Sequence, residues 1–457
     1  MNIFSSHPNV HVIGIGGAGM SGVARLLLEM GCSVSGSDAT ESPVLHELQK
    51  AGITVTIGHN ENALANAMVV LWSPAIKENN VEFAGAKQRG LTMLSRSELL
   101  RELAELVPVL GLTGTHGKTT ATSMMACVLK AAGRDDGRLL GAPVLGVGAN
   151  GHWGSPALLM EVDESYGTFS ELSPYALGLL NVEPDHLDHY GTFEHLEDAF
   201  TELLNRTAGP VVVWNDDLGS QRVGLRSSRQ VVTVGTNSSS DYQVSDIELN
   251  RRSSAFRVKG SGIDVALTLN VTGAHNVANA SVVAVLAQEL GISLTEISNG
   301  LSSFQGAPRR FEFMGSWRGV DVYEDYAHLP GEIRATISAA RAAGYKNITC
   351  VFQPHRVTRT LHLAEQFHTA FSDATNLIIS DIYTAGEPNP TGATGELISN
   401  GTSKHIATSY CATFSDVAST LRELHDQSDV VLFLGAGDIA SLASQLDGGL
   451  EKCVLNH

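Results

Sequence analysis

Residues 111–120, which read G-L-T-G-T-H-G-K-T-T, decide the fold of the middle of this chain. An apolar run precedes them, and apolar residues recur at helical spacing after them until Gly133 offers a helix end. A strand, a glycine loop, Gly-Lys-Thr and a helix form, in this order, the arrangement that binds a nucleotide triphosphate. Lys118 would then lie near the β- and γ-phosphates, and the Thr119 hydroxyl would be available to Mg²⁺. Leu112 stands where the common motif has its first glycine, so the loop is a variant.

The composition predicts a folded, multidomain protein of the cytoplasm. The 457 residues correspond to about three domains, and 43% of them are hydrophobic. The 48 acidic and 30 basic residues give a net charge of −18, which repels nucleic acid and anionic membranes, so we expect neither as a partner. The five cysteines are scattered, as is typical of reduced thiols. We find neither the basic region of a signal peptide nor an apolar run of ~20 residues.

A second glycine motif lies near the N-terminus. Gly14, Gly16 and Gly19 fit G-x-G-x-x-G after a short apolar run, and a helical pattern follows. Asp38 lies 19 residues after Gly19, as an acid that binds a ribose should. This motif predicts a Rossmann-like domain but does not identify its ligand, and taken alone it fits NAD.

Acidic clusters follow two further predicted strands, at residues 161–165 and 181–189. Ligands of open α/β sheets bind at the carboxyl ends of the strands. Carboxylates at that edge, beside a phosphate loop, suit Mg²⁺ ions that bridge triphosphate oxygens. The alternative interpretation is a pair of solvated acidic loops.

The last block of the chain is another series of strands, polar loops and helices. His328, His355, Arg356 and Arg359 follow two of its predicted strands, and this group of side chains favours anion recognition. Together the blocks predict an α/β fold with domains at 1–106, 107–308 and 309–457.

These motifs together resemble the Mur ligase family over essentially the whole chain. The matching stretches, in order, are GIGGAGMSG at 14–22, GTHGKTT at 114–120, DES at 163–165, DH at 185–186, HN at 275–276, RRF at 309–311, DY at 325–326, QPHR at 353–356 and GAGDI at 435–439. The resemblance implies a Rossmann-like N-terminal domain that binds a UDP-sugar, a central P-loop ATPase domain with a mostly parallel sheet, and a Rossmann-like C-terminal domain.

The resemblance also implies a reaction in peptidoglycan precursor synthesis. ATP, with Mg²⁺, would phosphorylate the lactyl carboxylate of UDP-N-acetylmuramate, and L-alanine would attack the resulting acyl phosphate. The addition of a tripeptide to the same sugar nucleotide stays open, although the QPHR stretch with Arg359 favours a single amino acid. The alternatives from other classes are an NAD-dependent oxidoreductase and a P-loop switch. We expect a monomer or a weak homodimer.

Roles for individual residues are carried over from the resemblance. The ATP-binding set is Gly114, Thr115, His116, Gly117, Lys118, Thr119, Thr120, His275, Asn276, Asn279, Arg310 and Asp325. The UDP-sugar set is Gly16, Gly17, Ala18, Gly19, Met20, Ser21, Ser37, Asp38 and His59. The amino-acid set is Tyr326, His328, His355, Arg356 and Arg359. The implied metal ligands are Thr119, Glu164 and His186, and the implied catalytic residues are Lys118, His186, Arg310 and His328.

The chain departs from the family pattern at two places. Residues 186–205 contain no lysine, so the carbamylated lysine of other branches is absent here. Ala327 and Leu329 stand where the family usually carries Gly and His, which affects the predicted amino-acid pocket.

Overall fold

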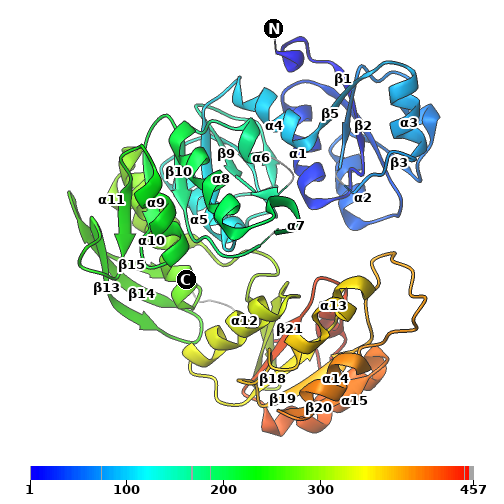
Figure 1. Ribbon diagram of the computed structural model, residues 1–457, viewed down its shortest axis with the longest axis vertical. Coiled ribbons are helices and arrows are strands. Elements are labelled where there is room, and N and C mark those ends of the chain that lie inside the picture. Colours follow the sequence, from blue (N-terminus) through cyan, green and yellow to red (C-terminus); the bar gives the residue numbers. More distant parts are fainter. Residues whose placement is uncertain (1, 74, 166–167, 186, 447, 452–457) are drawn as a thin grey trace. The chain divides into compact units, whose positions relative to one another are not determined.

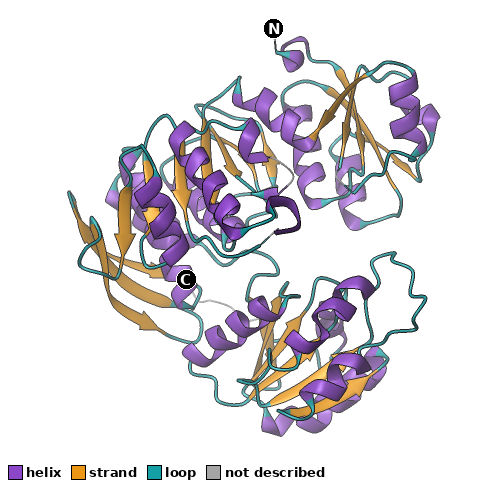
Figure 2. Ribbon diagram, in the orientation of Figure 1, coloured by secondary structure: helices purple, strands orange, loops and turns teal. Residues whose placement is uncertain are grey.

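The computed structural model describes the chain except residues 1, 74, 166–167, 186, 447 and 452–457. It contains three sheets, and helices flank the strands of each (Figure 2). The predicted fold class, three α/β domains with mostly parallel sheets, is confirmed. The domain boundaries given above stay predictions. Among the described helices, none is long and apolar enough to cross a membrane.

The N-terminal sheet is parallel, in the order β3-β2-β1-β4-β5 (Figure 1). The strand order reverses beside β1, which is the place where such sheets bind ligands. Separate apolar clusters cover its two faces, as a doubly wound sheet requires. Its elements are β1 (Asn9–Ile13), α1 (Ala18–Glu29), β2 (Ser33–Asp38), α2 (Pro43–Lys50), β3 (Thr54–Ile57), β4 (Val69–Trp72), α3 (Val81–Gln88), β5 (Thr92–Ser95) and α4 (Arg96–Ala104), with 3₁₀ turns η1 (Ile3–Ser6) and η2 (Glu61–Leu64).

The central sheet has ten strands in the order β15-β14-β13-β12-β11-β10-β6-β9-β7-β8. Strand β6 lies between β10 and β9 and is parallel to both. The elements are β6 (Val109–Thr113), α5 (Lys118–Ala131), β7 (Gly137–Leu139), β8 (Gly151–His152), β9 (Leu158–Glu161), α6 (Thr168–Glu171), β10 (Ala176–Leu179), α7 (Leu187–Tyr190), α8 (Phe193–Arg206), β11 (Val211–Trp214), α9 (Leu218–Arg226), β12 (Val232–Gly235), β13 (Tyr242–Leu249), β14 (Ser254–Gly260), β15 (Ile263–Leu269), α10 (Ala274–Glu289) and α11 (Leu294–Ser303).

The C-terminal sheet has six strands in the order β16-β17-β21-β18-β19-β20, and only the pair β16–β17 is antiparallel. Apolar clusters again cover both faces. The elements are β16 (Glu312–Trp317), β17 (Val320–Asp325), α12 (Pro330–Ala342), β18 (Ile348–Phe352), α13 (Val357–Phe367), β19 (Asn376–Ser380), α14 (Glu396–Thr402), β20 (Ala407–Cys411), α15 (Phe414–Leu424), η4 (His425–Gln427), β21 (Val430–Leu434) and η5 (Ile439–Gln445).

The chain packs as two compact units. Unit 1 comprises Met1–Glu248, Ala255–Asn270 and His275–Gln305, and it holds the first two sheets. Unit 2 comprises Leu249–Ser254, Val271–Ala274 and Gly306–His457, and it holds the third.

Candidate functional site

The loop between β6 and α5 has the backbone that a phosphate loop requires. Gly114 and Gly117 have φ angles of +142° and +84°, which side chains rarely permit. A Cβ atom on Gly117 would also lie 2.8 Å from Oδ1 of Asn279. The helix begins directly after Gly117, so its N-terminal N–H groups and its dipole face this loop.

Lys118 folds back over the loop. Its Nζ donates to Gly114 O at 2.7 Å, to Thr115 O at 3.2 Å and to Glu164 Oε2 at 2.7 Å. Burial would lower the pKa of this amine, but Glu164 and Asp163 raise it above its ordinary value. Burial raises the pKa of Glu164, and Lys118 offsets that only in part. Lys118 is therefore a cation, and it could exchange its ion pair with Glu164 for one with a bound phosphate.

Thr119 contacts a different acid at the end of β9. Its Oγ1 donates to Glu161 Oε2 at 3.0 Å, and the N–H of Gly141 donates to the other oxygen of Glu161 at 2.5 Å. The predicted metal ligands Thr119 and Glu164 therefore lie at one strand end, whereas His186 lies outside the described residues. Among the residues that the structure describes, no three His, Cys, Asp or Glu side chains come close enough together to hold a metal ion.

Asn181 is a residue of this site that the sequence reasoning did not select. Its Oδ1 accepts from the N–H of His116 at 2.7 Å, and its Nδ2 donates to the carbonyl of His116 at 3.0 Å. Thr115 Oγ1 also accepts from the N–H of Glu183 at 2.9 Å. The available signal was the position of Asn181 just after β10, because ligands and loop anchors gather at the carboxyl ends of neighbouring strands.

Of the three predicted ATP-binding residues on α10, Asn279 lies against the phosphate loop at Gly117. Asn276 is also buried, whereas His275 is exposed at the start of α10. The buried first-turn residue Thr120 completes the predicted ATP-binding set within unit 1.

The N-terminal glycine loop is anchored on the end of β2. The N–H groups of Gly14 and Ile15 donate to the carbonyl of Ser37 at 2.8 and 3.0 Å. The N–H of Gly16 donates to Asp38 Oδ2 at 2.8 Å. Asp38, predicted to contact the sugar nucleotide, therefore holds the loop itself.

Beneath this loop, Glu82 of α3 is a fully buried carboxylate that the sequence reasoning missed. Its Oε2 accepts from Ser37 Oγ at 2.5 Å and lies 3.5 Å from His59 Nδ1, and both partners belong to the predicted UDP-sugar set. Burial would raise its pKa, but hydrogen bonds from His11, Ser37 and the Asn60 amide lower it. Glu82 is thus an ionised anchor for Ser37 and His59. A lone Glu in the first turn of a helix gives no sequence signal for this role.

The segment between β7 and β8 joins the two glycine loops within unit 1. At one end Gly141 contacts Glu161, as described above. At the other, Nδ2 of Asn150 donates to the carbonyl of Ala18 at 2.7 Å, and His152 contacts Glu29 at 2.7 Å.

In unit 2, Asp325 ends β17 and accepts the N–H groups of Phe311 and Ala327, both at 2.7 Å. Burial raises its pKa to about 6. Arg309 and Arg310 lie over the ring of Tyr326, at 4.7 and 5.2 Å from its centre. Of the predicted ATP-binding and catalytic residues of this unit, Asp325 and Arg310 therefore lie at one strand end.

Four of the residues predicted for the amino acid follow the ends of strands β17 and β18, which lie on either side of β21 in the sheet. The rings of His328 and His355 are 6.0 Å apart, and Arg359 Nη1 lies 3.2 Å from His355 Nδ1. Burial, with the nearby Arg359, lowers the pKa of His355 to about 4. Arg356 lies at the start of α13, 4.0 Å from Glu387. The group presents guanidinium donors beside a neutral imidazole, which suits a carboxylate.

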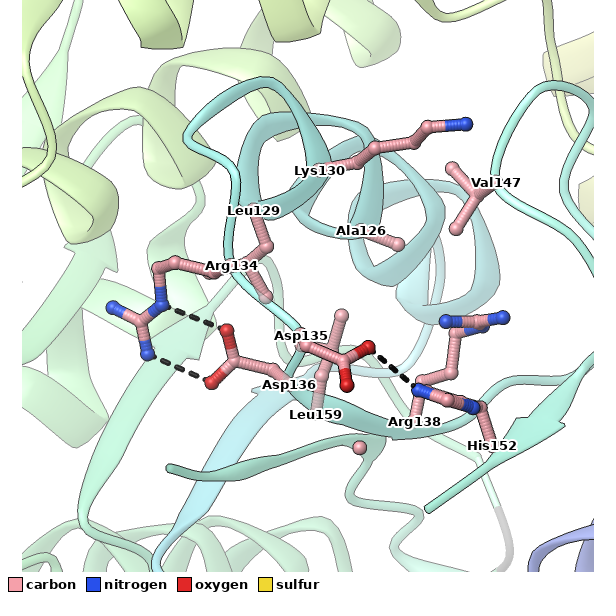
Figure 3. Close-up of a pocket in the computed structure, with 11 residues that line it drawn as sticks. Ala126, Leu129, Lys130, Arg134, Asp135, Asp136, Arg138, Val147, His152 and Leu159 are labelled. Atoms are coloured by element: carbon pink, nitrogen blue, oxygen red, sulfur yellow. Dashed lines mark hydrogen bonds and ion pairs between the residues drawn. The ribbon is translucent and has the colours of Figure 1, made fainter. Parts of the chain in front are cut away.

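A cavity of about 250 Å³ lies away from these groups, around the C-terminal half of α5 (Figure 3). Its charged lining residues are already engaged. Arg134 forms two hydrogen bonds with Asp136, and His152 contacts Asp135. No residue predicted from the sequence lines it.

Comparison with known proteins agrees with this arrangement. Three family models match: the Mur ligase family catalytic domain at 9–107, the Mur ligase middle domain at 112–287, and the Mur ligase glutamate ligase domain at 309–437. The UDP-N-acetylmuramate–L-alanine ligase of Myxococcus xanthus is 37% identical over 96% of this chain and 94% of its own length. That of Aquifex aeolicus is 39% identical over 97% and 98%.

Solved structures show the same fold. The UDP-N-acetylmuramate-alanine ligase of Thermotoga maritima has a TM-score of 0.81 at 29% identity, with 96% of this chain and 98% of that chain covered. A murein peptide ligase of Psychrobacter arcticus has a TM-score of 0.69 at 23% identity, with 96% and 98% covered. From its two glycine loops to the strand ends of its last sheet, this chain belongs to the Mur ligase family.

Proposed function

We propose that the protein uses ATP to join L-alanine to the lactyl carboxylate of UDP-N-acetylmuramate. The observation that carries the proposal is similarity over nearly the whole length of relatives that are named for this reaction. The proposal places the enzyme in the cytoplasm, where ATP and nucleotide sugars are available.

The chemistry explains why ATP is needed. A carboxylate cannot lose oxide, so one carboxylate oxygen first attacks the γ-phosphorus of ATP and ADP leaves. The resulting acyl phosphate has phosphate as its leaving group. The amine of L-alanine attacks the acyl carbon, loses a proton and expels phosphate. The protein's task is to align three substrates and to balance developing negative charge, and in this proposal Lys118 would do so at the β- and γ-phosphates.

The residues around Lys118 fit magnesium. Three carboxylates, those of Glu161, Asp163 and Glu164, act on this one ammonium group. The cluster therefore carries excess negative charge, and a triphosphate needs a further cation to enter it. The Thr119 hydroxyl and the Glu164 carboxylate would hold Mg²⁺ together with phosphate oxygens. When bound, the ion would neutralise charge on the transferred phosphoryl group.

The remaining assignments follow the sets given from the sequence. We assign the glycine loop of α1 with Ser37, Asp38 and His59 to the UDP-sugar, and α10 with Arg310 and Asp325 to the nucleoside and γ-phosphate of ATP. The group at the ends of β17 and β18 would receive the carboxylate of the incoming amino acid.

The test is ADP release in the presence of Mg²⁺, UDP-N-acetylmuramate and L-alanine. We expect turnover only when all are present, and none when Mg²⁺ is chelated. Comparison of kcat/KM for L-alanine with that for L-Ala-γ-D-Glu-diaminopimelate decides the nucleophile. Preference for the tripeptide would replace L-alanine in this proposal, and turnover without the nucleotide sugar would refute it.

A further inference from the structure

The segment that follows β19 contacts the predicted amino-acid group, although the sequence reasoning selected none of its residues. The N–H of Tyr383 donates to the carbonyl of Pro354 at 2.9 Å, and the N–H of Arg356 donates to the carbonyl of Tyr383 at 2.8 Å. These two hydrogen bonds enclose His355, which forms a parallel bridge with Tyr383. The backbone therefore places Tyr383 directly beside a histidine of the predicted site.

The ring of Tyr383 is held by two contacts. It stacks on the ring of His355, with 5.6 Å between the ring centres and 13° between the planes. It also packs on Gly437 in the loop after β21, where a Cβ would lie 2.8 Å from Cγ of Tyr383. The tyrosine is nevertheless 39% exposed, and its hydroxyl forms no hydrogen bond with any described residue. The ring of Tyr383, and not its hydroxyl, is therefore the part that the site uses.

The contacts of His355 determine which of its nitrogens can donate. Nη1 of Arg359 lies 3.2 Å from Nδ1, and Nδ1 must accept because arginine only donates. Burial lowers the pKa of this imidazole to about 4, and Arg359, His328 and Arg356 act in the same direction. Glu387 opposes them only in part, so the ring is neutral and its one proton lies on Nε2. Within the described parts of the chain this Nε2–H has no acceptor, so it can donate to a ligand.

We propose that Tyr383 is a positioning residue of the amino-acid site, where it holds the ring of His355 so that Nε2–H donates to the carboxylate of the incoming amino acid. The inference rests on the proposed function for the identity of this ligand. A stacked ring restricts the rotation of the imidazole. A donor that is already oriented loses less conformational freedom when the ligand binds. The alternative is that Tyr383 only fills the space between two loops.

The experiment measures kcat and KM for L-alanine with full-length variants at saturating ATP, Mg²⁺ and UDP-N-acetylmuramate. Tyr383→Leu keeps an apolar side chain on Gly437 but loses the stacked ring, so KM for L-alanine should rise about 2- to 10-fold. KM for ATP and for the nucleotide sugar should not change. Tyr383→Phe keeps the ring and should behave like the wild type. Tyr175→Leu is the matched control, because Tyr175 is also exposed and packs on a glycine, Gly209.

A second measurement follows His355 itself by NMR of the ring nitrogens, assigned with His355→Gln. In the wild type and in Tyr383→Phe, the neutral ring should carry its proton on Nε2. In Tyr383→Leu the ring is more hydrated, so its pKa should rise towards the ordinary value of 6.5. A proton on Nδ1 in the wild type, or the same His355 pKa in Tyr383→Leu as in the wild type, would contradict the proposal.

The kinetic results can also overturn it. An unchanged KM for L-alanine in Tyr383→Leu would do so, and so would a Tyr383→Phe variant as impaired as Tyr383→Leu. Equal increases in KM for L-alanine and for ATP would indicate a general structural role instead. A wild type that does not turn over L-alanine would refute the proposed function, whereas an active wild type that Tyr383→Leu matches would refute only this inference.

Discussion

At the scale of one residue, Lys118 is the cation of the phosphate loop, and its replacement tests the role of that loop. Lys118→Ala should lower ATP turnover by at least about 10²–10³-fold, because a preorganised charge at the transferring phosphoryl group is lost. Binding of UDP-N-acetylmuramate, measured by calorimetry, should persist, since its predicted residues belong to the elements and loops around the first sheet. Lys130→Ala, in the last turn of the same helix, is the control and should retain full turnover. An equally active Lys118→Ala variant would mean that the loop has been misinterpreted.

The buried Glu82 should stabilise the folded protein through the hydrogen bonds that it accepts. In Glu82→Gln an amide N–H₂ replaces an oxygen that accepts from Ser37 and His11, so we expect a loss of about 1–3 kcal/mol in the free energy of unfolding by urea. The exposed Glu78 offers a control, and Glu78→Gln should change this value by less than about 0.5 kcal/mol.

The pH dependence of the Glu82 effect follows from its lowered pKa. The stabilisation is complete above the unfolded-state pKa of about 4.3 and is lost as the pH falls through the lower folded-state value. The difference between wild type and Glu82→Gln should therefore shrink in acid. A difference that grows as the pH falls would contradict this interpretation.

Asp325 should show the opposite pH dependence. Its pKa is raised from 3.8 to about 6, so the folded protein binds the proton more tightly than the unfolded chain does. The contribution of Asp325 to stability is then highest below its unfolded-state pKa and is lost as the pH rises through its folded-state pKa. Relative to Asp325→Asn, the wild type should lose at most about 3 kcal/mol between roughly pH 4 and pH 7 in urea unfolding. A pH-independent difference would show that this carboxyl titrates normally.

At the scale of elements, the same Gly→Ala substitution should have opposite effects on stability at two glycines with different surroundings. Gly151 of β8 packs against α1 so closely that a Cβ would lie 1.8 Å from the carbonyl oxygen of Gly22. Gly151→Ala should therefore destabilise unit 1 by about 1–3 kcal/mol or more. Gly331, in the first turn of α12, has nothing within 4 Å of such a Cβ, and Gly331→Ala should stabilise unit 2 by about 0.5–1 kcal/mol. Urea unfolding of both variants measures the two changes, and a tolerated Gly151→Ala would disprove the close packing.

The elements also show where sequence patterns work well. The predicted helix after the phosphate loop ends at Ala131, and Gly133 follows it with a φ of +66°, as expected of a glycine at a helix end. Likewise α1 ends at Glu29, and Gly31 follows with a φ of +91°. Both ends were predictable because a left-handed backbone and a broken apolar period are local properties.

At the scale of the whole molecule, two compact units should unfold separately. Calorimetry should resolve more than one transition, because each unit has its own core. Unit 1 contains every residue of the predicted UDP-sugar set. UDP-N-acetylmuramate should therefore raise the free energy of unfolding of unit 1 by about 2.7 kcal/mol at a hundredfold excess over Kd, and its transition should move to a higher temperature. Gly151→Ala and Gly331→Ala identify which transition belongs to which unit. A single transition that shifts as a whole with ligand would exclude independent unfolding.

The sequence by itself determined the fold class, the two glycine loops and the family, because glycine positions, helix ends and the apolar period are encoded locally. Only the tertiary structure decided which side chains meet. The decisive contacts join residues far apart in the chain: Lys118 with Glu164, His116 with Asn181, Ser37 with Glu82, and Ala18 with Asn150. Such partners depend on strand order, for example on β6 lying between β9 and β10. A pattern of apolar residues specifies that a strand is buried, but not which strands become its neighbours.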